Sequence, residues 1–160
     1  MNSLRTLTRL AIPLALVVSV TSAEAQQKPL KEQVAGVWSL VSGSQIGADA
    51  NGLLILDSSG HMSMQIIRPG RPNFASNSRM QGTADENKGA VQGMIAYFGR
   101  YTVSEADKTI TYQIERSSYP NWDATEQKRP FTVTADELRY TNPAPSSGGA
   151  PAQLIWKRAK

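Results

Sequence analysis

Cysteine is absent from this chain of 160 residues, and histidine occurs once, as His61. A zinc or copper site needs about three or four nitrogen and sulfur ligands, which this composition cannot supply. Disulfides, which stabilise many small exported domains, cannot form either, so a packed core must stabilise the fold. We therefore expect no metal and no other cofactor.

Motifs typical of several enzyme and nucleic-acid-binding classes are also missing. No G-x-S-x-G elbow is present, so a nucleophilic serine would have to rely on His61, which lies at a predicted turn. The glycine pair in Ser146–Gly149 is not followed by a helical pattern, which excludes a phosphate-binding loop. The net charge of +4 is spread along the chain without a basic block, so we expect no nucleic-acid partner.

The longest apolar run is too short for a transmembrane helix. It extends from Leu10 to Val20, after Arg5 and Arg9 and before Ala23-Glu-Ala25. A spanning helix needs about 20 apolar residues, whereas a positive start, a short apolar stretch and a small-x-small ending are typical of a secretory signal peptide. We predict that residues 1–25 are removed after Ala25. The mature protein would then be periplasmic or secreted, without stable membrane insertion.

Strand-forming patterns dominate the chain after the signal. Residues 26–33 are polar and predict a flexible leader or a short helical turn, and residues 34–160 suit one domain. Short turns rich in Asp, Ser and Glu join three pairs of strand-like segments into hairpins. The expected strands cover residues 37–42, 53–56, 61–67, 97–103, 108–115, 131–133, 138–140 and 153–157.

Eight short strands in hairpin order favour an antiparallel barrel or sandwich, and barrel closure removes exposed strand edges. We predict a mainly β, antiparallel up-and-down barrel that is a monomer, with one short helix. The helix would begin at the capping-box pair Thr83 and Glu86. Its apolar stripe would consist of Val91, Met94, Ile95 and Phe98. Gly89 and Gly93 each lower the stability of the helix by about 1 kcal/mol relative to alanine. Packing of the helix across one end of the barrel would therefore have to stabilise it.

A series of motifs runs from Gly36 to Arg158. They are Gly36-Val-Trp-Ser-Leu-Val41, the stretches 52–65 and 68–76, the stretch 96–103, and Pro120-Asn-Trp122 with Thr125-Glu-Gln-Lys-Arg129. Together they resemble the bacterial and fungal lipocalin-like domain family, whose first strand carries G-x-W-x-L-V. The resemblance implies a calycin-type barrel with an internal cavity, and it implies no single activity. Where the family usually has T-H-x-x-E, this chain reads Thr111-Tyr-Gln-Ile-Glu115, so no chemistry through that histidine is implied.

Alternation along the strands divides polar from apolar side chains. Tyr112 shares one face with Ile110, Ile114 and Arg116, and we expect this set to line the interior. A phenol in an apolar cavity would orient a ligand, although Tyr112 can equally be an ordinary core residue. In the strand 61–67, the sequence does not decide whether the face with Gln65 or the face with Met64 points inward.

Two loop motifs predict cations and an aromatic ring near one end of the barrel. Arg68-Pro-Gly-Arg71-Pro72 presents two guanidinium groups beside prolines, and Trp122 is followed by Gln127 and Arg129. These side chains could recognise a carboxylate or another anion, or they could plug the barrel and hold its loops together. The candidate ligand-binding residues are Tyr112, Tyr97, Trp122, Arg71, Arg129 and Gln65.

Three functions are compatible with these features. The leading hypothesis is binding of a small hydrophobic or amphipathic molecule, which can carry an anionic group. The second is a cofactor-free acid–base enzyme of the isomerase or cyclase type, with Tyr112, Glu115, His61 and Arg129 as its titratable or charged groups. The third is a filled barrel that serves as a structural or envelope module. Binding is favoured, because Tyr112 and Glu115 point to opposite faces of their strand.

Overall fold

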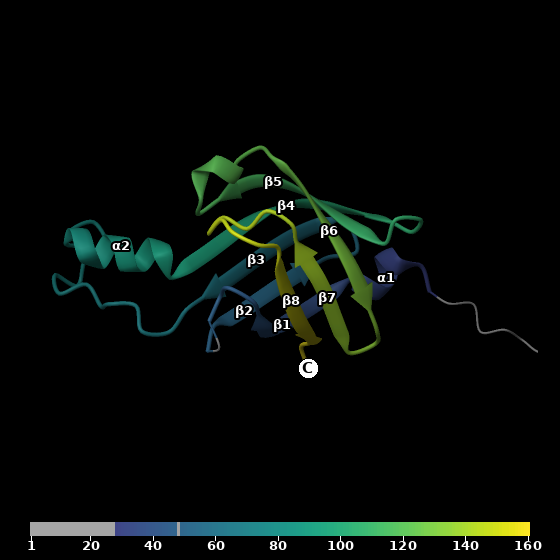
Figure 1. The fold of residues 1–160 in the computed structure, drawn as a ribbon, viewed down its shortest axis with the longest axis horizontal. Coiled ribbons are helices and arrows are strands. Elements are labelled where there is room, and N and C mark those ends of the chain that lie inside the picture. Colours follow the sequence, from purple (N-terminus) through teal and green to yellow (C-terminus); the bar gives the residue numbers. More distant parts are fainter. Residues whose placement is uncertain (1–27, 48) are drawn as a thin grey trace, which may run out of the picture.

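A computed structural model describes residues 28–47 and 49–160 (Figure 1). The predicted signal peptide, residues 1–25, lies outside the described residues, as do the first two residues of the predicted leader. Of the two alternatives for residues 26–33, the structure has the helical one from Leu30 onward, because α1 covers Leu30–Val34. Within the described part of the chain, no helix is long and apolar enough to cross a membrane.

Eight antiparallel strands close into a barrel in chain order, with the last strand paired to the first. The strands are β1 (Gly36–Gly43), β2 (Asn51–Leu56), β3 (His61–Ile67), β4 (Met94–Ser104), β5 (Thr109–Ser117), β6 (Glu126–Val133), β7 (Glu137–Asn142) and β8 (Ala152–Arg158). The predicted up-and-down barrel is confirmed. Strand β6 begins at Glu126, before the predicted start at residue 131. Proline is uncommon inside strands, so Pro130 weakens the strand pattern of this segment in the sequence.

The barrel interior receives the apolar face of each strand. In β5, Ile110, Tyr112 and Ile114 are buried, as the alternation predicts. In β3, Met64 is buried and Gln65 is exposed, so the methionine face points inward. This arrangement decides the question that the sequence left open, since a strand places successive side chains on opposite faces.

A β-bulge changes the faces near the end of β5. Gly99 pairs with Ile114 and Phe98 pairs with Arg116, which leaves Glu115 as the extra residue. Arg116 is therefore exposed rather than inside with Tyr112, so that part of the prediction is wrong. The two strands approach so closely that a Cβ atom on Gly99 would lie 2.1 Å from the Gln113 carbonyl oxygen.

One end of the barrel is closed by α1 and by a pair of large side chains. The indole Nε1 of Trp38 donates to the carbonyl of Val34 at 2.8 Å. The Arg158 guanidinium lies 4.1 Å from the Trp38 ring centroid and donates to the carbonyls of Gln33 and Ala35. Trp38 is fully buried, so this end is filled with side chains.

The second helix, α2 (Ala84–Gln92), begins with the predicted capping box between Thr83 and Glu86. It ends at Gln92, because Met94 and Ile95 pair with Ile67 and Ile66 of β3 as part of β4. The apolar stripe predicted for one helix is therefore wrong. No residue of α2 is buried, and Figure 1 shows the helix beyond the barrel end opposite α1 rather than packed across it.

Candidate functional site

A cavity of about 520 Å³ lies at the barrel end opposite α1. It is bordered by the β1–β2 loop, the segment between β3 and β4, the β5–β6 loop and the β7–β8 loop. Strand residues form the deeper wall, among them Met64, Ile66, Tyr97, Tyr140, Ala152 and Leu154. The barrel is thus filled at one end and hollow at the other.

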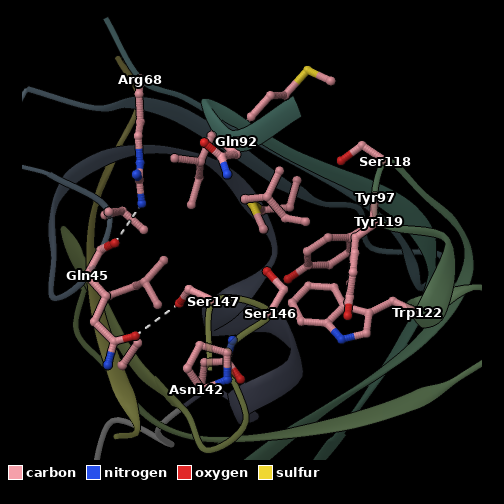
Figure 2. A pocket seen from close by; sticks show the side chains of 18 of the residues that line it. Gln45, Arg68, Gln92, Tyr97, Ser118, Tyr119, Trp122, Asn142, Ser146 and Ser147 are labelled. Atoms are coloured by element: carbon pink, nitrogen blue, oxygen red, sulfur yellow. Dashed lines mark hydrogen bonds between the residues drawn. The ribbon is translucent and has the colours of Figure 1, made fainter. Parts of the chain in front are cut away.

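Three aromatic rings form one wall of the cavity. Trp122 belongs to a short 3₁₀ helix, η1 (Pro120–Trp122), in the β5–β6 loop. Its ring lies edge-on to Tyr97, with centroids 5.7 Å apart, and edge-on to Tyr119, also at 5.7 Å. Figure 2 shows these three side chains together on one side of the pocket. Such a wall offers contact area to a flat, apolar molecule.

The opposite wall is polar and ties two loops to the end of β3. The Arg68 guanidinium donates to the Gln45 carbonyl at 2.7 Å, and the Ser147 hydroxyl donates to the Gln45 side-chain oxygen at 3.1 Å (Figure 2). The Gln45 amide donates in turn to the carbonyl of Ala150 at 2.6 Å. Arg68 therefore stabilises the rim, one of the two roles considered for the Arg68–Pro72 motif.

The Trp122 loop is held by hydrogen bonds to the start of β4 and by one to the end of β5. The Ser118 amide donates to the Ala96 carbonyl at 2.7 Å, and the Ala96 amide donates to the Ser118 hydroxyl at 2.9 Å. The Asp123 carboxylate accepts from the Ser117 amide at 2.7 Å. These contacts fix Trp122 relative to Tyr97, so the aromatic wall is preformed.

Arg129 lines the cavity from β6 and is only 2% exposed. Its guanidinium donates to the Lys128 carbonyl at 3.1 Å and to the Gln127 side-chain oxygen, and lies 5.9 Å from the Tyr112 ring centroid. Its Nε has no hydrogen-bond partner among the described residues. No carboxylate in the described part of the chain forms an ion pair with Arg129.

Three buried tyrosines surround this arginine. The ring of Tyr112 lies 6.1 Å from that of Tyr97 and 6.2 Å from that of Tyr140, measured between centroids. Burial raises the pKa of all three hydroxyls, and the nearby Arg129 charge offsets this only in part at each of them. The hydroxyls are therefore neutral at neutral pH, and none supplies a counter-ion for Arg129.

Of the six predicted ligand-binding residues, three line the cavity, one is buried beside it and two lie outside it. Tyr97, Trp122 and Arg129 line the cavity. Tyr112 is fully buried beside them without lining it.

The last two candidates lie outside the cavity. Gln65 is on the outer face of β3, because Met64 and Ile66 take the inner face. Arg71 is exposed in the segment before α2, with its aliphatic carbons beside Gly93.

The groups of the acid–base hypothesis are not brought together. His61 is exposed, with Nδ1 2.7 Å from the Ser59 hydroxyl and 3.6 Å from the Asp57 carboxylate. Glu115 is exposed on the outer face at the bulge. Only Tyr112 and Arg129 are neighbours. The described residues also contain no cluster of three or more His, Asp or Glu side chains that could hold a metal ion.

Sequence reasoning missed the residues that the loops bring to the rim. Ser44–Ile46 and Pro145–Ser147 line the cavity, although 102 positions separate Gln45 from Ser147 along the chain. The Pro- and Ser-rich composition of residues 142–151 was a usable signal, because a long ordered loop in a compact domain is often functional.

Comparison with known proteins agrees with this architecture. The model of the lipocalin-like domain family matches residues 35–159. The chain belongs to the lipocalin-like domain family. A relative of this lipocalin-like protein, the 4'-hydroxy-3'-methoxypropiophenone carrier protein of Aspergillus oryzae, is 36% identical in an alignment 106 residues long. The alignment covers 61% of this chain and 96% of the relative. The family match and the carrier relative support a ligand-binding barrel.

Proposed function

We propose that this lipocalin-like protein is a carrier that binds one small, largely hydrophobic aromatic molecule in the cavity at the barrel end. The observation that carries this proposal is the cavity of about 520 Å³ behind a preformed wall of Tyr97, Tyr119 and Trp122. Pockets for small molecules are commonly about 300–1,000 Å³, mostly apolar, with a few polar groups that set orientation. A barrel filled throughout would leave no such volume.

The relative from Aspergillus oryzae suggests a probe. By its name, that protein carries a propiophenone with one hydroxyl and one methoxy group. Such a molecule has a flat ring suited to the aromatic wall, and polar substituents that could face Gln45, Arg68 or Arg129. We infer that the ligand of this chain belongs to the same broad class of substituted aromatic molecules.

Binding of this probe is expected to quench tryptophan fluorescence through Trp122, because this residue lines the cavity. Trp38 is at the closed end, and Trp156, although it stacks on Tyr140, does not line the cavity. In the Trp122→Phe variant most of the quenching should disappear, and the phenyl ring should still support binding with an affinity within about tenfold of wild type. Fluorescence titration measures the quenching.

Calorimetry on the same variant separates loss of the reporter from loss of binding. Heat of binding without quenching in Trp122→Phe places the probe beside this residue. Failure of the wild-type protein to bind, by either method and up to the solubility of the probe, would contradict the proposed carrier function.

We also propose that the carrier is exported as a precursor and is a monomer after cleavage. The support is the sequence of residues 1–25, with Arg5 and Arg9 before an apolar stretch and Ala23-Glu-Ala25 after it. Native mass spectrometry of the protein purified from the exported fraction should give a single chain that begins at Gln26. An intact N-terminus would refute cleavage after Ala25, retention of the protein in the cytoplasm would refute export, and the mass of a dimer would refute the monomeric state.

A further inference from the structure

Arg129 carries a buried positive charge that the described residues do not neutralise. It is 2% exposed, and it lies among the neutral hydroxyls of Tyr97, Tyr112 and Tyr140. Transfer of a charged group from water into such surroundings is unfavourable unless a counter-ion or a full set of hydrogen bonds compensates it. Its acceptors are the Lys128 carbonyl and the Gln127 amide oxygen, both neutral.

Unused hydrogen-bonding capacity is concentrated around this charge. A guanidinium has about five N–H donors, and the Nε donor of Arg129 has no partner among the described residues. The hydroxyl of the adjacent Tyr112 and the indole Nε1 of Trp156, whose ring stacks on Tyr140, are also without partners among the described residues. Buried donors are normally satisfied, and of these three residues only Arg129 lines the cavity, so its unpaired Nε points to a ligand that supplies an acceptor oxygen.

We propose that Arg129 binds an anionic oxygen of the ligand and that the ligand class is phenols acidified by a para-acyl group, bound as phenolates. This inference rests on the proposed carrier function. A para-acyl group delocalises the negative charge of a phenolate onto the ketone oxygen, so such phenols lose their proton more readily than simple phenols. On binding, the phenol proton passes to solvent, and the phenolate supplies the counter-ion that Arg129 lacks.

The remaining charged and titratable groups of the cavity do not compete for this role. Arg68 also lines it, but its guanidinium donates to the Gln45 carbonyl at the rim. Tyr119 lines it from the β5–β6 loop, where the side chain is exposed. The pKa values of Tyr97 on β4, Tyr112 on β5 and Tyr140 on β7 are all raised by burial, so these hydroxyls stay neutral over the range in which an acylated phenol ionises. A change of affinity with pH in that range would therefore report ionisation of the ligand rather than of these tyrosines.

The test compares 4'-hydroxy-3'-methoxypropiophenone with its 4'-O-methyl ether, which cannot ionise. The phenolate absorbs at longer wavelength than the phenol, so the protonation state of the bound ligand can be read directly from its spectrum over a pH series. We expect the pKa of the bound phenol to be lowered by at least about one unit, which corresponds to a tenfold preference for the phenolate. Wild-type protein alone suffices for this comparison.

Two variants identify the residue responsible. In Arg129→Met, the lowered pKa of the bound phenol and the tenfold preference should disappear, while binding of the methyl ether is retained. Lys128→Met is the matched control, since its side chain is exposed on the opposite face of β6 and its loss removes the same charge. The control should keep the lowered pKa of the bound phenol.

The possible outcomes distinguish failure of the role proposed for Arg129 from failure of the carrier function. Equal affinity for the phenol and the ether, with no lowering of the pKa of the bound phenol, overturns the role of Arg129 and leaves the carrier function standing. Binding of neither molecule to wild-type protein contradicts the carrier function itself. A lowered pKa that persists in Arg129→Met overturns the assignment of the charge to this residue.

Discussion

Replacement of Ala152 by tryptophan is expected to weaken binding of the aromatic probe by at least about tenfold. Ala152 is the first residue of β8, is 3% exposed and lines the cavity from the inner face of the barrel. An indole at this position would occupy space that the ligand requires. The backbone should tolerate the change, because the added ring enters an existing cavity rather than a filled core. Calorimetric titration measures the loss.

Gln153→Trp is the matched control for this substitution. Gln153 is the next residue of β8 and is exposed on the outer face, so an indole there should not affect the cavity. Thermal unfolding of both variants verifies that they are folded. Wild-type affinity in Ala152→Trp would mean that the ligand does not occupy this cavity.

Gly99→Ala is expected to lower the free energy of unfolding by about 3 kcal/mol, at the upper end of the cost of overpacking. The added Cβ atom would lie 2.1 Å from the Gln113 carbonyl oxygen and 2.8 Å from the Glu115 amide nitrogen. Both atoms belong to the backbone of β5, so no side-chain rotation can relieve the contact, and the bulge between β4 and β5 must open. Chemical denaturation gives the change in free energy.

Gly148→Ala provides the comparison for Gly99→Ala. Gly148 has a φ of 72°, and no atom lies within 4 Å of the position that a Cβ would occupy. Only the strained backbone opposes the substitution, and we expect a loss of about 1 kcal/mol. Equal losses for the two variants would contradict the close approach of β4 and β5 at Gly99.

The barrel could be predicted because its determinants are local. Alternation of apolar and polar residues, as around Ile110, Tyr112 and Ile114, determines which face of a strand points inward. Short turns determine which strand pairs with it. The failures occurred where pairing between strands decides the outcome. Met94 and Ile95 fit a helical period in sequence, yet they belong to β4 because Ile67 and Ile66 of β3 pair with them.

The candidate site was harder to predict, because loops distant in sequence build it. Trp122 and Arg129 were identified from their motif, but nothing in the sequence indicates that Arg129 lacks a carboxylate partner among the described residues. That property depends on every residue that the fold places around the guanidinium. The contact of Gln45 with Ser147 and Ala150 joins two loops that are far apart along the chain, and no local sequence pattern predicts it.

The most direct test of binding inside the barrel is NMR spectroscopy of isotope-labelled protein titrated with 4'-hydroxy-3'-methoxypropiophenone. We expect shifts in the amide signals of Ser44–Ile46, Ser118–Trp122 and Pro145–Ser147, where an amide proton is present, and in the Nε–H signal of Arg129. All of these residues except Pro120 and Asn121 line the cavity. Shifts confined to the exposed apolar face formed by Val37 and Ile55 would contradict binding inside the barrel.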